Sequence, residues 1–261
     1  STSSVSVTMG SLGTFQSGSS FGGHAGSYDG IAGAYEEVDD GAGTALSTNL
    51  IGSQFDQGGI FYTAPAIDAG GGSLTLHLGY SPTGNDVALA GGVTDSTAAM
   101  GSATQAGITL AHDSGLTLGV FALEAKRNGG AATTTQDVFA GSWFAKYAMG
   151  PVSVGYGQSY TDMGVASGAT AATAAKTVAA ASGNFEAEEY VISFNVNDNL
   201  SVSYAKADDT YDAQAGASAG STTSDAIADV TVDHKSIQAA YSMGSMSIKA
   251  YRQETSNVGY N

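Results

Sequence analysis

The sequence predicts an all-β fold: a transmembrane, antiparallel up-and-down β-barrel. Three observations predict it. Apolar and small polar residues alternate in about twelve short segments, Gly is abundant, at 37 of 261 residues, and short and long connections alternate along the chain. No apolar run reaches the roughly 18 residues that a membrane-spanning helix needs. We expect one barrel domain that spans residues 1–261, with an inward-folded constriction loop at about 18–58.

The alternation is clearest between residues 151 and 160. Val152, Val154 and Tyr156 fall on one face of an extended strand, and the Ser and Gly residues between them fall on the other, because successive side chains of a strand point to opposite faces. A helix is disfavoured, since each interior Gly costs it about 1 kcal/mol relative to Ala. The same two-residue period predicts strands at 5–9, 14–17, 59–64, 73–80, 106–112, 116–124, 139–147, 190–197, 200–205, 236–243 and 246–251.

The connections between these strands are sorted by length. Tight turns rich in Gly, Asn and Asp are predicted at 10–13, 113–115, 148–150, 197–199 and 244–245, with a somewhat longer link at 65–72. Long polar loops are predicted at 18–58, 81–105, 125–136, 161–188 and 206–235. In a meander, alternate connections lie at opposite ends of the sheet, so one end should carry all the short turns. Outer-membrane barrels have this asymmetry, whereas a soluble β-sandwich, the main alternative, has no reason to sort its loops.

The residue types on the two faces suit a barrel in a bilayer. A closed barrel satisfies its backbone hydrogen bonds internally, so an apolar outer face can meet hydrocarbon. The inner face is wet, and Ser, Gly, Thr and Asn are suitable there. Aromatic side chains should mark the two water–lipid boundaries. The candidates for these girdles are Phe61, Tyr62, Tyr80, Trp143, Tyr147, Tyr156, Phe194, Tyr204 and Tyr241.

Charge and motifs argue against several functions. The net charge of −16 and the scattered Lys and Arg residues argue against a nucleic-acid partner. The four His residues have no metal-ligand spacing, and there is no nucleophile elbow or phosphate-binding loop. We therefore predict a protein that is not an enzyme, with no catalytic residue, no confident metal site and no bound cofactor.

The loop at 18–58 is the candidate for a pore constriction. A structureless segment of this length inside a compact domain is uncommon and is usually functional. Acidic clusters in a pore favour cations, and this loop contains no Lys or Arg. The alternative is a solvated acidic surface loop. The candidate constriction acids are Asp29, Glu36, Glu37, Asp39 and Asp40.

Two acidic groups in the last long loop are weak candidates for structural calcium, because Ca²⁺ prefers oxygen ligands. Neither fits the EF-hand template, and a solvated extracellular face is the alternative. The first group is Asp208, Asp209 and Asp212, and the second is Asp225, Asp229 and Asp233.

Several segments resemble the general porins of alphaproteobacteria. Val5-Ser-Val-Thr-Met-Gly-Ser-Leu-Gly-Thr-Phe15, and then Ala34-Tyr-Glu-Glu-Val-Asp-Asp40, are similar to the strand, turn, strand and constriction-loop start of that family. Phe61-Tyr-Thr63 resembles the strand that follows the loop. The segments from Phe144 to Tyr156 and from Ile237 to Lys249 resemble later hairpins. The resemblance follows strand order over nearly the whole chain.

The resemblance implies a sixteen-stranded homotrimer in the Gram-negative outer membrane, in contact with the lipid bilayer and lipopolysaccharide. It also implies basic residues on the barrel wall opposite the loop acids. Mapped onto this chain, these bases are Lys146 and Lys249, whereas Arg252 has the parity of the lipid face. With twelve visible strands, the chain is expected to be a fragment that lacks the first strands and the last one; the alternative is a genuine twelve-stranded barrel.

The expected function is a water-filled channel for passive diffusion of small hydrophilic solutes and ions, with a preference for cations. Two alternatives come from other classes of function. One is a surface-exposed structural or adhesion barrel, or a phage receptor. The other is an outer-membrane hydrolase built on a barrel scaffold.

Overall fold

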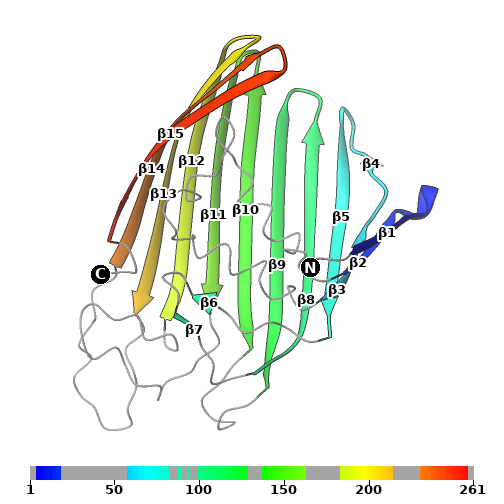
Figure 1. Cartoon of the computed structure of the whole chain (residues 1–261). Coiled ribbons are helices and arrows are strands. Elements are labelled where there is room, and N and C mark those ends of the chain that lie inside the picture. The colour runs from blue at the N-terminus through cyan, green and yellow to red at the C-terminus, as the bar shows by residue number, and fades with distance from the viewer. Residues whose placement is uncertain are drawn as a thin grey trace.

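The computed structural model describes residues 4–18, 58–82, 88–89, 93–94, 99–128, 137–162, 183–213 and 230–257. Nearly all of these residues lie in β-strands (Figure 1). Within the described ranges, the single helical element is η1, a 3-10 turn over Gly10–Leu12. In that same part of the chain, no helix is long and apolar enough to cross a bilayer.

The main sheet is an antiparallel meander whose strands neighbour one another in sequence order. Its strands are β1 Ser4–Thr8, β2 Thr14–Gly18, β3 Gly59–Thr63, β5 Gly72–Ser81, β8 Ala99–His112, β9 Leu116–Asn128, β10 Val138–Met149, β11 Val152–Asp162, β12 Gly183–Asn197, β13 Leu200–Ala213, β14 Val230–Met243 and β15 Met246–Ser256. The short β4 (Ile67–Asp68) pairs with β5, and β6 (Ala88–Leu89) pairs with β7 (Val93–Thr94) in a separate ribbon. Every strand expected from the alternation is present, so the predicted fold class is confirmed.

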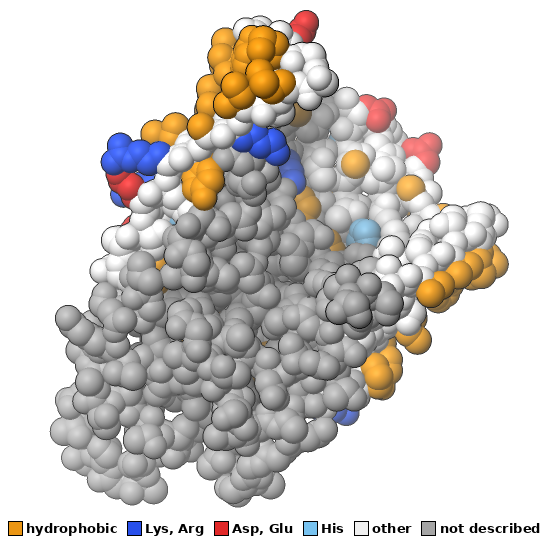
Figure 2. Space-filling model, in the orientation of Figure 1, with side chains coloured by type: hydrophobic (Ala, Val, Ile, Leu, Met, Phe, Trp, Pro, Cys, Tyr) orange, Lys and Arg blue, Asp and Glu red, His pale blue; other side chains and the backbone are white. Residues whose placement is uncertain are grey.

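The sheet curves into an incomplete cylinder (Figure 1). The strands β1 and β15 end the strand order, and among the described residues they do not pair with each other. The sheet is therefore not closed by this part of the chain. Both edges carry exposed apolar side chains, and Figure 2 shows hydrophobic groups gathered along them.

The short turns lie at one end of the sheet, at the top in Figure 1, as predicted. Gly115, in the β8–β9 turn, has a φ of +92°, which side chains with a Cβ rarely adopt. Its amide donates to the His112 carbonyl at 2.9 Å, and its carbonyl accepts from the Ala148 amide at 3.1 Å. This glycine therefore joins one hairpin to the next. All the long connections leave from the opposite end.

Several strands extend well beyond the predicted bounds, and the predicted loops are correspondingly too long. β12 begins at Gly183 rather than 190, β13 continues to Ala213 and β14 begins at Val230. The region 206–213, interpreted as loop, is therefore strand. Backbone pairing continues there, although the outward side chains are no longer apolar and the alternation that predicts a strand has ended.

We predict that Gly115→Ala destabilises the barrel more than Gly150→Ala does. Both positions have positive φ, which costs a residue with a Cβ about 1–2 kcal/mol. A Cβ on Gly115 would also overlap the Ala148 carbonyl oxygen, whereas a Cβ on Gly150 meets nothing within 4 Å. Urea titrations read by the mobility shift of folded protein on unheated gels measure both variants. Equal midpoints would contradict this account of the turn.

Candidate pore wall

The two faces of the sheet differ in burial. Along β9 and β10, buried and exposed residues alternate, and the pairing register keeps each set on one side of the sheet. We call the buried side the inner wall and the other side the outer wall. The inner wall carries Phe121, Ser142, Ser159, Glu189 and Gln238, and the outer wall carries Val120, Trp143, Tyr190 and Ile237.

Large and small side chains alternate across the inner wall. One row of paired residues contains Gly119, Phe144, Gly157, Glu189, Ala207 and His234, in that order from β9 to β14. The Phe144 ring lies over Gly119, because a Cβ placed on that glycine would overlap the ring. Phe121 covers Gly107 in the same way. Both rings therefore lie flat against the wall.

These rings make part of the inner wall apolar. Phe121 and Phe144 are 3% and 5% exposed, and their ring centroids are 6.4 Å apart. Buried Leu123, Phe185 and Val191 lie on the same wall. The expectation that Ser, Gly, Thr and Asn line the inner face is therefore wrong around β9, β10 and β12, where large apolar side chains also lie. The neighbouring glycines and the flat packing explain how such bulky groups fit there.

The inner wall of β12–β15 carries a polar section. Glu189 and His234 are buried there, and each is only 1% exposed. His234 Nδ1 lies 3.1 Å from Thr255 Oγ1. Ser203 Oγ donates to Gln238 Oε1 at 3.4 Å, and Gln238 Nε2 donates to Ser236 Oγ at 3.3 Å. The first contact joins β14 to β15, and the other two form a separate set that joins β13 to β14.

The predicted wall bases lie on the inner wall, as their parity indicated. Lys146, on β10, has its ammonium 5.5 Å from the centre of the Phe144 ring, and it interacts electrostatically with Glu189. Lys249, on β15, pairs with Ala240 close to the β14–β15 turn. Arg252 lies on the outer wall, which agrees with its predicted place on the lipid face of the strand. Its guanidinium forms an ion pair with Glu254. The predicted loop acids Asp29, Glu36, Glu37, Asp39 and Asp40 lie outside the described residues.

Sequence reasoning missed Glu189, Asp209 and His234 as inner-wall residues. Asp209 and His234 were assigned to a loop, and Glu189 lies one residue before a predicted strand. The two-residue period of the strands could have identified two of them. Glu189 lies two residues before Val191, and His234 lies two residues before Ser236, so each shares a strand face with a residue that was assigned to the inner face.

The structure separates the first group of calcium candidates. Asp208 and Asp209 are neighbours on β13, so their side chains lie on the outer and inner walls respectively. The ammonium group of Lys206 forms an ion pair with Asp208, and its Nζ lies 3.9 Å from Asp233 Oδ1. Across the described part of the chain, no three His, Cys, Asp or Glu residues are grouped to hold a metal. The structure therefore does not support one calcium site that includes both Asp208 and Asp209.

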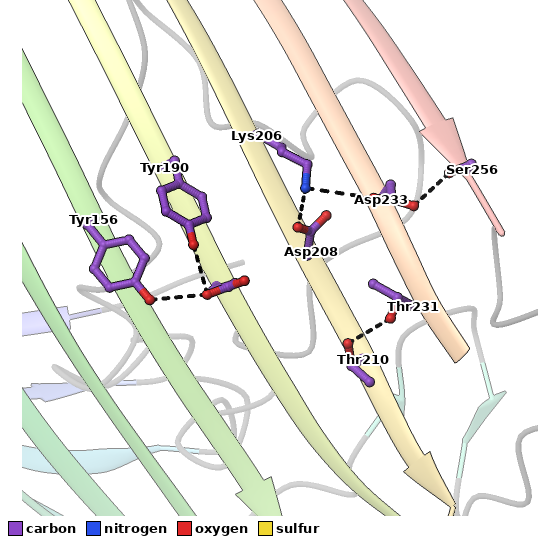
Figure 3. Close-up of polar contacts among 9 residues, drawn as sticks. Tyr156, Tyr190, Lys206, Asp208, Thr210, Thr231, Asp233 and Ser256 are labelled. Atoms are coloured by element: carbon purple, nitrogen blue, oxygen red, sulfur yellow. Dashed lines mark hydrogen bonds and ion pairs between the residues drawn. The ribbon is translucent and has the colours of Figure 1, made fainter. Parts of the chain in front are cut away.

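The outer wall changes from apolar to polar along each of the strands β12–β14. Ile192 and Tyr190 on β12 are followed, towards the long connections, by Glu188. The hydroxyls of Tyr156 and Tyr190 both donate to Glu188 Oε2, at 3.1 and 3.0 Å (Figure 3). Ser256 Oγ donates to Asp233 Oδ2 at 3.2 Å on the same wall. Tyrosines therefore mark the level at which the outer wall becomes charged.

The predicted girdle aromatics lie on this outer wall with one exception. Trp143 packs edge-on against Tyr156, with 5.3 Å between the ring centroids. Tyr80, Tyr147 and Tyr204 are exposed. Phe61 is wrong as a girdle residue, because it is 3% exposed and pairs with Gly79 of the inner wall. Trp143 lies in mid-strand rather than at a strand end, because the strands continue beyond the apolar band.

Comparison with known proteins shows a likeness in fold. No family model and no curated protein matches the chain. Among solved structures, the trimer form of the outer-membrane protein OmpT of Vibrio cholerae matches with a TM-score of 0.55 and 12% identity, over 94% of this chain and 66% of that one. A porin refined at 1.8 Å resolution matches with a TM-score of 0.52 and 12% identity, over 95% of this chain and 74% of that one. The loop L8 deletion mutant of OmpT matches with a TM-score of 0.52 and 15% identity, over 94% of this chain and 70% of that one.

These likenesses show the fold of an outer-membrane β-barrel. This chain spans about two thirds of the OmpT chain that it matches.

We predict that Gly119→Ala destabilises the barrel by about 1–3 kcal/mol, the usual cost of overpacking. The added methyl group would overlap the Phe144 ring. Combining it with Phe144→Leu should restore part of the loss, because the smaller side chain vacates that space. Urea unfolding of both single variants and the double variant gives the coupling energy. Additive effects would contradict the packing of this ring on Gly119.

Proposed function

We propose that the chain forms the wall of a water-filled channel in the outer membrane, through which small hydrophilic solutes and ions diffuse passively. The observation that carries this proposal is that the two walls of a single curved sheet differ in the polarity of their side chains. The outer wall exposes Val120, Ile192, Phe194 and Ile237 to its surroundings, as a lipid-facing surface would. The inner wall carries Glu189, His234 and Lys146, which a hydrocarbon contact would not tolerate.

The sorted connections support an orientation in the membrane. Outer-membrane barrels have short periplasmic turns and longer extracellular loops. The turns at 113–115 and 148–150 would then face the periplasm, and the charged outer-wall residues of β12–β14 would lie towards the cell surface. Contact with the bilayer and lipopolysaccharide, and assembly as a homotrimer, belong to the same proposal; the similar OmpT structure is a trimer form.

The proposed channel prefers cations. The described inner wall carries the carboxylates Glu189 and Asp209 against the ammonium groups of Lys146 and Lys249. The acids at 29–40, with no basic residue in the same connection, would shift this balance towards negative charge. Diffusion through such a channel requires no catalytic residue and no cofactor.

Single-channel recording in planar bilayers tests the proposal. We expect large current steps that are proportional to voltage, and a reversal potential of cation-selective sign in a KCl gradient. A barrel that inserts but conducts no ions would contradict the channel and favour a structural or adhesive role. Hydrolysis of lipid or peptide by the purified, folded protein would favour the enzymatic alternative.

We predict that Lys146→Gln increases the preference for cations and that Arg252→Gln does not. Both changes remove one positive charge, but Lys146 lies on the inner wall and Arg252 on the outer wall. A unit charge in water interacts with an ion 4 Å away by about 1 kcal/mol, so the permeability ratio should change by less than about tenfold. Reversal potentials in the same KCl gradient measure both variants. Equal shifts, or a shift with Arg252→Gln alone, would contradict the assignment of the walls.

A further inference from the structure

The outer wall contains a groove of about 710 Å³ across β9–β13. It runs between two adjacent rows of outward residues that the pairing register defines. One row contains Val120, Trp143, Gln158, Glu188 and Asp208, and the other contains Ala122, Gly141, Tyr160, Glu186 and Thr210. Gly141 leaves room at the base of the groove because it has no side chain.

The two ends of the groove differ in chemistry. The end on β9 and β10 is formed by Val120, Phe139 and Trp143, which are apolar or aromatic and exposed. The end on β12 and β13 is formed by Glu186, Glu188 and Asp208. Every charged side chain that lines the groove is therefore a carboxylate.

The three carboxylates of the groove outnumber the ammonium group of Lys206 beside them. Glu188 accepts hydrogen bonds from the hydroxyls of Tyr156 and Tyr190, and neither donor carries a positive charge (Figure 3). Lys206, on the same strand as Asp208, pairs with that carboxylate and also interacts electrostatically with Glu188. The acidic end of the groove is thus complementary to a cation, and the other end to an apolar group.

We propose that this groove binds a membrane lipid whose head group carries a primary ammonium group. The inference rests on the proposed position of the outer wall in the bilayer. The ammonium would lie between Glu186 and Glu188, where it can donate charge-assisted hydrogen bonds. The acyl chains would lie along Val120 and Trp143. The level of the groove supports this, because the outer wall changes there from apolar to charged, and aromatic residues mark the head-group region.

Trp143 allows a direct measurement, because it is the only Trp in the chain and it lines the groove. The full chain is reconstituted in phosphatidylcholine vesicles that contain brominated phosphatidylethanolamine, phosphatidylcholine or phosphatidylglycerol. Bromine on the acyl chains quenches Trp143 on contact, so quenching gives relative binding constants. We expect phosphatidylethanolamine to bind about fivefold more tightly than phosphatidylglycerol, as for a partly exposed ammonium beside carboxylates and an aromatic ring.

Two kinds of variant separate charge from shape. The double variant Glu186→Gln, Glu188→Gln should lower the ratio of phosphatidylethanolamine to phosphatidylglycerol binding to about one, because it removes the carboxylates that pair with the ammonium group. The control is Glu124→Gln, which neutralises an exposed outer-wall acid that does not line the groove, and it should leave this ratio unchanged. Gly141→Leu should remove the preference with both carboxylates retained. A Cβ on Gly141 meets no atom closer than 3.7 Å, so the first atom of the new side chain fits without displacing a neighbour. Gel mobility confirms that each variant is folded.

The outcomes distinguish this inference from the proposed function. Equal quenching by the three lipids would place Trp143 against lipid and overturn the groove alone. If no lipid quenches Trp143 in a chain that co-floats with the vesicles, another protein surface, such as a second copy, covers the groove and the inference is wrong. A folded chain that does not co-float with vesicles would contradict the membrane location as well.

Discussion

Hydrogen bonding between neighbouring antiparallel strands is the constraint on which the rest of this structure depends. Hydrocarbon offers the backbone no partner, so each strand must be paired along its length. Pairing also fixes which wall a side chain belongs to, since a shift by one residue exchanges the two faces of a strand. Trp143 and Gln158 pair on the outer wall, and Ser142 and Ser159 pair on the inner wall. Both the proposed lumen and the groove on the outer wall follow from this register.

The sequence predicted the fold wherever one face of a strand is apolar. Over 139–147 and 190–197 the two-residue period is strong, and strands were assigned there correctly. The prediction failed at Glu186 and Asp208, where the outer wall is polar and the period no longer distinguishes the two faces. Backbone pairing continues through these residues and depends on the neighbouring strand rather than on local composition. The sequence of one strand does not show whether a neighbouring strand continues beside it.

The candidate site was predictable in part for the same reason. Parity placed Lys146 and Lys249 on the inner wall because both lie within strands that the pattern identifies. Glu189 and His234 lie where the pattern is weak, so their contribution to that wall emerged only from the register. The aromatic section is a different case. Phe144 fits because Gly119 lies beside it on another strand, and such compensation across strands is not visible in either segment alone.

The rings that lie over glycines also affect the dimensions of the proposed channel. A phenylalanine that projects from a barrel wall narrows the aperture by its full length, whereas one that reclines on a neighbouring strand adds little more than the thickness of its ring. Phe121 and Phe144 therefore contribute bulk to the lining without acting as a plug. Glycine on one strand thus keeps the proposed channel wide where the neighbouring strand carries an aromatic side chain.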